Sequence, residues 1–319
     1  MHLSANPVVI GLGNWAGFRS SLEQPVKLVS FFRKNLTPGI GLSGFGGGRV
    51  LDLNAIDPHF PQNINAFLAG GDGLLDTARR IQERCGEHED AFLGHEQYTL
   101  RPPVPNPSKF LLLGANYRAH VEETGREIPE KPVIFGRWAH TLIASGEPIR
   151  VPKVSNRVDF EGELVVVIGK EGKSIPLNRA WDHVAGYTCF NDVSVRDYQR
   201  MSEPQQWTLG KNFDNSGPLG PWVVTRDEIP HPDNLHLKTL VNSKVMQDGN
   251  TGDLIFDIPY LIELISSVMT LFPGDLISTG TPGGVGDARD PPVYLKDGDV
   301  VTVTIEGIGE LTNPVLDER

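Results

Sequence analysis

Two glutamates, with a single residue between them, stand at the start of a strongly apolar run. The segment Asp159–Gly169 reads DFEGELVVVIG, so Glu161 and Glu163 directly precede or begin a run of aliphatic residues. Side chains two positions apart on a strand point to the same face, and such a run is typical of a strand buried on both faces. Two carboxylates that share a face repel each other. A divalent cation between them would remove this repulsion.

Asp192, in the segment Cys189–Ser194, offers a third carboxylate near another apolar stretch. Ligands that are all oxygen favour Mg²⁺ or Mn²⁺, with Ca²⁺ as a substitute, over Zn²⁺. The spacing alone leaves a second interpretation open, because Glu-x-Glu is also common on solvated strand faces that bind no metal. The residues therefore give a candidate metal site, Glu161, Glu163 and Asp192.

The N-terminal part of the chain predicts a small unit rich in β structure. Two β runs are expected at 26–32 and 49–53, around the glycine cluster 44–48, and one helix at 73–85. Four prolines crowd between residues 102 and 107, where they prevent regular structure and indicate a linker. We therefore expect three parts, which are an N-terminal arm (1–25), a small N-terminal domain (26–105) and a catalytic domain (106–319).

Beyond the linker, short β-rich runs recur and helices are few. The runs are Phe110–Leu113, Leu164–Ile168, Trp222–Thr225, Leu276–Thr279 and Val300–Ile305. The main helix is expected at Asp257–Leu271. This pattern favours an α+β protein that is mainly β, with an antiparallel or mixed sheet, over a doubly wound fold.

A series of polar and glycine-rich motifs follows the linker. The motifs are Asn116–Glu123 (NYRAHVEE), Lys131–Gly136 (KPVIFG), Asp159–Glu163 (DFEGE), Gly186–Gln199, Gly210–Asp214 (GKNFD), Gly217–Pro221, Pro273–Asp275 and Gly280–Gly286 (GTPGGVG). In content and order they resemble the fumarylacetoacetate hydrolase (FAH) family, in the branch of acylpyruvases and 2-hydroxyhepta-2,4-diene-1,7-dioate isomerases. The resemblance runs from Phe110 to the C-terminus. It implies an FAH-type mixed β-sandwich or roll, preceded by a small β-rich domain.

The resemblance also implies a reaction. Glu161, Glu163 and Asp192 would hold Mg²⁺ or Mn²⁺, and the ion would bind two oxygens of a 2-oxo acid and stabilise its enolate. In the hydrolases of the family, water attacks the distal carbonyl and a carbon-carbon bond breaks. We therefore expect a metal-dependent hydrolase of acylpyruvate-like or fumarylacetoacetate-like compounds. A decarboxylase, isomerase or hydratase at the same site is an alternative, and so is a non-catalytic binding subunit of the same fold.

Three residues resemble the catalytic groups of the family. His120 and Glu123 match its His-Glu pair, which activates water, and their i, i+3 spacing lets them meet on one helical turn. In relatives this segment is a lid that orders when substrate binds. Lys211 matches a lysine that offers positive charge near the metal, with a structural ion pair as the alternative.

Three further residues resemble substrate ligands. Arg196 and Gln199 match a pair in which the guanidinium binds a carboxylate and the amide donates to an oxyanion. Thr281 lies on a glycine-rich turn that can hold a carboxylate. An internal salt bridge for Arg196 and a plain turn for Thr281 are equal alternatives. Arg137 stands where relatives often carry a lysine, which indicates an altered pocket wall.

The composition of the chain excludes some classes of binding partner. With 29 Lys+Arg against 40 Asp+Glu, the net charge of −11 argues against a sequence-independent grip on nucleic acid or anionic lipid. No apolar run approaches the roughly 20 residues of a membrane helix, and two cysteines are too few for a disulfide framework. We expect a cytoplasmic enzyme with a small 2-oxo acid as substrate, without nucleic acid or membrane partners. The resemblance implies a homodimer.

Overall fold

The computed structural model describes residues 25–125 and 127–318 of the chain. The expected N-terminal arm therefore lies outside the described residues, apart from Pro25. In the described part, strands dominate and most helices are short, which confirms the expected α+β class with mainly β structure.

A mixed sheet of 12 strands runs through the described part of the molecule. Its main path follows the order β4-β3-β2-β1-β14-β12-β11-β17-β6-β7, while β5 pairs with β1 and β8 with β14. The strands are β1 (Lys27–Arg33), β2 (Pro38–Phe45), β3 (Arg49–Asp52), β4 (Phe92–Leu93), β5 (Tyr98–Leu100), β6 (Phe110–Gly114), β7 (Val133–Gly136), β8 (Leu142–Ile143), β11 (Gly162–Ile168), β12 (Val184–Asn191), β14 (Gly217–Thr225) and β17 (Leu276–Ser278).

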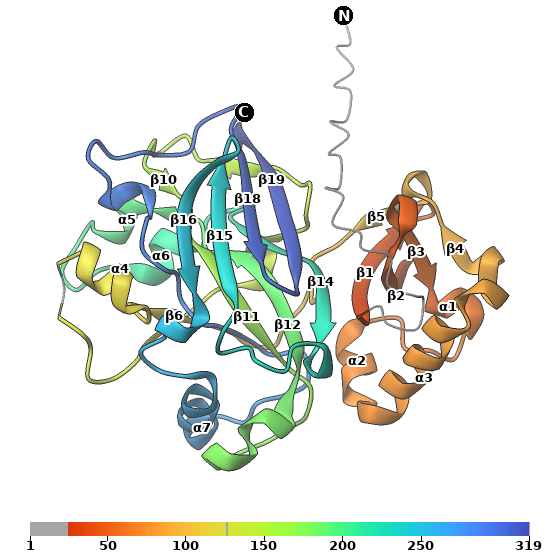
Figure 1. Cartoon of the computed structure of the whole chain (residues 1–319). Coiled ribbons are helices and arrows are strands. Elements are labelled where there is room, and N and C mark those ends of the chain that lie inside the picture. Colours follow the sequence, from red (N-terminus) through yellow and green to blue (C-terminus); the bar gives the residue numbers. More distant parts are fainter. Residues whose placement is uncertain (1–24, 126, 319) are drawn as a thin grey trace, which may run out of the picture.

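A second sheet of five strands covers the centre of the first, as Figure 1 shows for β15, β18 and β19 beside β11 and β12. Its strands are, in order, β16 (Lys244–Asn250), β15 (His236–Val241), β18 (Val300–Ile305), β19 (Gly309–Asp317) and β9 (Ile149–Val151), and a separate pair is formed by β10 (Val158–Asp159) and β13 (Ser194–Val195). Between the two sheets, Leu164 and Val166 of β11 share one core with Leu237 and Val303. The expected β-sandwich is therefore present.

The helices lie at the edges and ends of the sheets. They are α1 (Leu53–Ile56), α2 (Ile64–Ala69), α3 (Gly71–Glu83), α4 (Arg118–Glu123), α5 (Arg196–Gln199), α6 (Trp207–Lys211) and α7 (Ile258–Val268). The two helices expected from the sequence are α3 and α7. Helix α7 begins after Asp257, whose side chain accepts a hydrogen bond from the Tyr260 N–H, and it stops at Val268, three residues before the predicted end.

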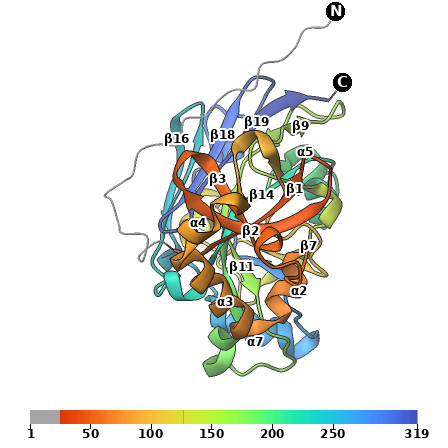
Figure 2. The same ribbon diagram turned by 90° about the vertical axis from the view of Figure 1, so that its right-hand side faces the viewer.

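Strands β1–β5 and helices α1–α3 form one unit at the side of the molecule (Figure 1), and Figure 2 shows this unit facing the viewer. Strand β1 pairs with β14 through Lys27 and Leu28, so the large sheet continues into this unit. Its core is also continuous, because Phe67 of α2 belongs to the same cluster as Val165 of β11. The proline-rich stretch 101–109 is irregular, as predicted. The division of the chain into two domains at residues 105 and 106 stays a prediction.

Candidate active site

The three predicted carboxylates meet because β11 and β12 run antiparallel. Gly162 at the start of β11 pairs with Asn191 at the end of β12, which places Glu161 and Glu163 next to Asp192. The Asp192 N–H donates to the Glu161 carbonyl over 2.8 Å, and this hydrogen bond holds the two residues next to each other. All three side chains are buried, and one oxygen from each lies within 4.8 Å of the others. The strand register, which the sequence does not state, thus assembles the site.

Buried cations hold two of these carboxylates. The Lys211 Nζ lies 2.6 Å from Glu161 Oε2 and 2.6 Å from Asp192 Oδ2. Arg137 donates to Asp192 Oδ1 over 2.8 Å, and the Arg196 Nη1 lies 2.7 Å from Glu161 Oε1. Each carboxylate therefore has a fixed orientation before any ligand binds.

Glu163 is the member of the triad without a salt bridge in the described part of the chain. Its Oε2 accepts hydrogen bonds from the Ser278 hydroxyl and from the Gly280 N–H, the latter over 3.2 Å. Both donors are neutral, so they orient the carboxylate without cancelling its charge. When Glu163 is ionised, its negative charge is therefore not compensated by a cationic side chain of the described chain.

The pKa values reflect this difference. Burial opposes ionisation of Glu161, but the positive charges of Lys211 and Arg196 outweigh it and lower its pKa to about 2. For Glu163, burial and the neighbouring carboxylates of Asp192 and Glu161 raise the pKa well above its ordinary value. A divalent cation at this point would favour the ionised form of Glu163. The oxygen-only donors and the excess negative charge fit an ion of the Mg²⁺ and Mn²⁺ class.

A narrow cavity of about 40 Å³ lies against the triad. The predicted site residues that line it are His120, Glu161, Glu163, Arg196, Gln199, Lys211 and Thr281. The two remaining predicted residues, Asp192 and Glu123, contact Lys211 and His120 from behind. The structure therefore brings the whole predicted set together around one space.

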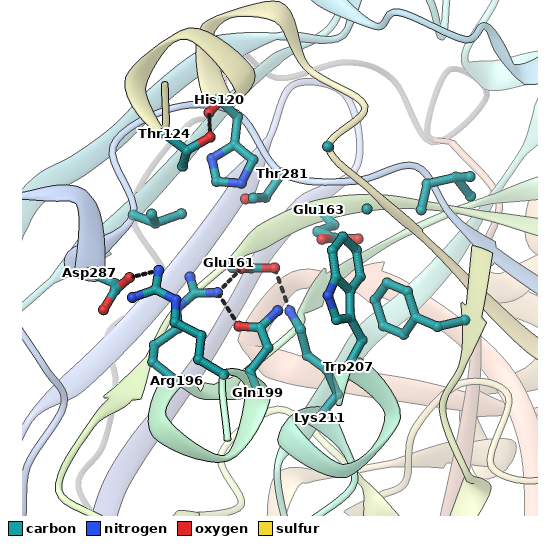
Figure 3. A pocket seen from close by; sticks show the side chains of 16 residues that line it. His120, Thr124, Glu161, Glu163, Arg196, Gln199, Trp207, Lys211, Thr281 and Asp287 are labelled. Carbon is teal, nitrogen blue, oxygen red and sulfur yellow. Dashed lines mark hydrogen bonds and ion pairs between the residues drawn. The ribbon is translucent and has the colours of Figure 1, made fainter. Parts of the chain in front are cut away.

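Helix α4 presents His120 to this cavity from one side, while α5 and α6 present Gln199 and Lys211 from the other (Figure 3). The His120 Nδ1 lies 2.8 Å from Glu123 Oε1, and the other oxygen of Glu123 accepts from the Gly284 N–H over 2.6 Å. An ionised Glu123 only accepts hydrogen bonds, so Nδ1 is the donor of this pair and Nε2 is the ring nitrogen available for proton transfer. The pairing predicted from the i, i+3 spacing is present.

Arg196 has many partners within the protein. Its Nε and Nη2 contact Asp159 Oδ2 over 2.8 and 2.7 Å, and its Nη1 contacts both Glu161 Oε1 and the side-chain oxygen Oε1 of Gln199. This is the internal salt bridge that the sequence left as an alternative. Within the described residues the Gln199 side-chain nitrogen has no acceptor, so its protons are available to a substrate oxygen. Substrate binding by Arg196 and Gln199 stays a prediction.

Thr281 also has internal partners. Its hydroxyl donates to the Gly162 carbonyl over 2.9 Å and accepts from the Gln247 amide over 2.8 Å. These bonds tie the glycine-rich turn to the start of β11, next to the two glutamates. A role in substrate binding stays a prediction, and it would involve the backbone of the turn more than the hydroxyl.

Some residues of the site were missed or only partly recognised in the sequence. Arg137 departs from the lysine that relatives often carry, but nothing in the sequence pointed to its contact with Asp192. Asp159 lies in the DFEGE motif, and its side chain accepts from Arg196 and from the Gly286 N–H. Arg200 and Asp287, which pair at the cavity wall, gave no signal because charged residues are common in loops.

Residues 109–316 match the family model described as fumarylacetoacetate (FAA) hydrolase C-terminal. The match spans more than half of the chain, and the fold and site described above agree with it. The fold and the acidic site define a metal-dependent enzyme, and the chain belongs to the fumarylacetoacetate hydrolase family.

Individual relatives resemble nearly the whole chain. Oxaloacetate tautomerase fahd2, mitochondrial, of Xenopus laevis is 43% identical over 280 residues, which cover 88% of this chain and 86% of the relative. The 2-hydroxyhepta-2,4-diene-1,7-dioate isomerase of Mycobacterium marinum superposes with a TM-score of 0.71 at 33% identity, covering 92% and 99% of the two chains. Maleylpyruvate hydrolase from Sphingobium sp. SYK-6, solved with manganese(II) and pyruvate, gives 0.74 at 30% identity, covering 92% and 100%.

Among the described residues, no helix has the length and apolar character needed to cross a membrane. The name of the Xenopus relative places that protein in mitochondria. The cytoplasmic location and the homodimer expected for this chain stay predictions.

Proposed function

We propose that this protein is a metal-dependent tautomerase that interconverts the keto and enol forms of oxaloacetate or of a closely related 2-oxo dicarboxylate. The observation that carries the proposal is the cavity itself, in which the imidazole of His120 faces the carboxylate triad across a space of about 40 Å³. In this cavity a base and a set of metal-type ligands face the same small space, which is the arrangement that proton transfer next to a metal-bound keto group requires. The similarity to a vertebrate oxaloacetate tautomerase over most of both chains supports the same substrate class.

Glu161, Glu163 and Asp192 would hold the cation. When bound, a divalent cation would draw electron density from the keto oxygen of a 2-oxo acid and make the neighbouring C–H bonds more acidic. Lys211 aligns Glu161 and Asp192 for this task through contacts of 2.6 Å, and Arg137 aligns Asp192 over 2.8 Å. The protein groups thus prepare the charge distribution in advance, which is the arrangement that favours charge formation in a transition state.

His120 would carry the proton. Its Nε2 takes a proton from C3, the electron pair of that C–H bond forms the C2=C3 double bond, and the carbonyl electrons move to the oxygen on C2. The imidazolium then returns the proton to that oxygen. Both C3 and this oxygen are bonded to C2, so a single base within reach of both completes the exchange. Glu123 stabilises the imidazolium through the Nδ1 hydrogen bond.

Hydrolysis of a carbon-carbon bond is the second candidate. The same His120–Glu123 pair is suited to take a proton from water, and the chain resembles a solved maleylpyruvate hydrolase. A hydrolase must also accommodate the acyl group of its substrate. The rings of Phe135 and Trp207, with centroids 5.4 Å apart, occupy one end of the cavity and reduce that room. The cavity therefore favours the tautomerase.

A direct assay separates the candidates. Enol oxaloacetate is added to the enzyme with Mg²⁺ or Mn²⁺, with or without a chelator, and the loss of the enol's ultraviolet absorbance is followed. Release of pyruvate and carbon dioxide is measured in parallel, and a panel of acylpyruvates is tested for cleavage. We expect chelator-sensitive loss of the enol without matching pyruvate release. Chelator-sensitive acylpyruvate cleavage with no effect on the enol would reject the tautomerase in favour of the hydrolase, and carbon dioxide release alone would indicate a decarboxylase.

A further inference from the structure

Arg200 is a cation of the cavity wall that the carboxylate triad does not use. Arg196 and Lys211 also line the cavity, but their side chains are only 6% and 2% exposed and contact the buried acids of the site. The Arg200 side chain is 49% exposed, and its one ion-pair partner in the described chain is Asp287. Arg200 is therefore the arginine of this wall that remains accessible to a ligand.

Its position is fixed from both sides. Arg200 caps α5, and its N–H donates to the Arg196 carbonyl one turn earlier. Asp287 lies in the 3₁₀ turn Gly286–Ala288, and its Oδ1 accepts from the Tyr294 hydroxyl over 2.7 Å. In Figure 3, Asp287 lies at one end of the cavity and Trp207 at the other. The Arg200–Asp287 pair thus marks the polar end of the cavity.

We propose that Arg200 binds the second carboxylate of a 2-oxo dicarboxylate, the one remote from the keto group. This inference rests on the proposed function, because that function places the 2-oxo acid end of the substrate at the triad. The remote carboxylate then needs a cation outside the triad. In the described chain, Arg200 contacts Asp287 through Nη2, which leaves Nε and Nη1 as donors for a carboxylate.

Asp287 makes the effect of Arg200 specific to substrates whose remote end is charged. A bare Asp287 carboxylate would repel the remote carboxylate of the substrate, and Arg200 cancels that charge while offering donors of its own. Removing Arg200 therefore has two unfavourable effects on a dicarboxylate, which are a lost ion contact and an exposed like charge. A substrate with a neutral remote end experiences neither of them.

The same contact would suppress decarboxylation. In that reaction the C3–C4 bond breaks, its electron pair forms the enolate, and the remote carboxylate leaves as neutral carbon dioxide. Arg200 stabilises the charged carboxylate in the ground state and loses its partner as the charge leaves, so it raises the barrier to this reaction. Tautomerisation keeps the carboxylate charged throughout. Arg200 would thus favour proton transfer over loss of carbon dioxide.

The test compares Arg200→Gln with wild type on oxaloacetate and on its 4-methyl ester, which lacks the remote charge. For Arg200→Gln we expect kcat/KM for oxaloacetate to fall about 10- to 100-fold, the scale of one lost hydrogen-bonded ion contact, and kcat/KM for the ester to stay within about threefold on the same scale. The ratio of carbon dioxide release to tautomerisation should rise. Arg179→Gln, which removes an exposed arginine paired with Asp182 elsewhere on the surface, is the matched control.

A second variant, at Asp287, should change oxaloacetate binding in the opposite direction. Asp287→Asn should release Arg200 and strengthen oxaloacetate binding, while Asp287→Asn combined with Arg200→Gln should lose less than Arg200→Gln alone. Equal losses on oxaloacetate and ester, or no loss on oxaloacetate, would overturn the proposal for Arg200.

Failure of the proposed function would look different, since wild type would then tautomerise neither compound. In that case the role of Arg200 is tested by binding alone. The affinities of the protein for oxaloacetate and for its ester are measured by calorimetry with Mn²⁺ present. A wild-type preference for oxaloacetate that Arg200→Gln abolishes supports the proposal. Equal binding of the two compounds by wild type refutes it.

Discussion

The cavity has two walls that are held in different ways. The carboxylate wall comprises Glu161, Glu163 and Asp192 with their cations, on or beside β11, β12, α5 and α6, and its side chains are almost completely buried. The α4 wall is one short helix, in which the His120 and Glu123 side chains are 12% and 23% exposed. Its polar links to the rest of the protein include Glu123 to the Gly284 N–H and the Ala119 N–H to Asp253.

This difference indicates a division of labour. A wall fixed by buried ion pairs is suited to bind a cation and the acid end of a substrate with constant geometry. A short helix attached by one buried side chain of its own, Val121, and a few surface hydrogen bonds is suited to open for a ligand and then present a base. Mutations in one wall should therefore change metal binding, and mutations in the other should change proton transfer.

The largest effect is expected for Glu163→Gln. Because Glu163 carries the charge that no salt bridge compensates, its loss should abolish Mn²⁺ binding and all metal-dependent turnover. The fold should persist, since the amide can accept from Ser278 as the acid does. Mn²⁺ binding by electron paramagnetic resonance and the enol assay provide the readouts, and Glu171→Gln on the surface is the control. Full metal-dependent turnover in Glu163→Gln would remove Glu163 from the metal site.

The next effect concerns the α4 wall. Replacement of His120 by Ala should reduce tautomerisation about 10²- to 10⁴-fold, the usual contribution of a general base, while Mn²⁺ affinity stays unchanged. His140→Ala, an exposed histidine on the segment Ala139–Thr141, is the control. A parallel loss of metal binding in His120→Ala would show that the two walls do not act separately.

Glu123→Gln should have a smaller effect on the same wall. The amide keeps the helix in place but no longer supplies a negative charge to the imidazolium, so we expect a fall in kcat of about 10-fold, at the low end for loss of an outer partner. Its neighbour Glu122, exposed on the same helix, provides Glu122→Gln as control. Equal rates for the two variants would contradict the role given to Glu123.

The smallest effect is a pH dependence of stability in the metal-free protein. The pKa of Glu163 is raised on folding, so its protonated form contributes stability below the ordinary glutamate pKa, and this contribution is lost as pH rises through the raised pKa. Metal-free wild type should therefore lose stability relative to Glu163→Gln from acidic to neutral pH, and Mn²⁺ should restore it. Parallel pH profiles from denaturant unfolding would contradict this.

The carboxylate wall was largely predictable from the sequence, and its supports were not. The run after Glu163 marked a buried strand, and the FAH motifs placed Asp192 and His120 in the same site. The ion pair of Arg137 with Asp192 depends on how β7 and β12 lie relative to each other, and no spacing in the chain encodes that distance. Sequence patterns identified the ligands better than the residues that hold them.

The N-terminal unit shows a second reason for missed elements. Strand β2 (PGIGLSGF) was not predicted, because glycine is unfavourable in strands and its apolar residues are few. In the structure, a Cβ at Gly41 would lie 2.5 Å from the Leu51 carbonyl oxygen, so the glycine permits close approach of β2 and β3. A residue that is locally unfavourable for a strand is here required by its neighbour.

The central claim is that the carboxylate wall and α4 together remove a proton next to the keto group. Exchange of the C3 hydrogens of oxaloacetate in D₂O, followed by proton NMR with Mg²⁺, tests this most directly. The account predicts exchange well above the uncatalysed rate for wild type, abolished by chelator and nearly abolished in His120→Ala. Exchange that is insensitive to chelator, or as fast in His120→Ala as in wild type, would contradict it.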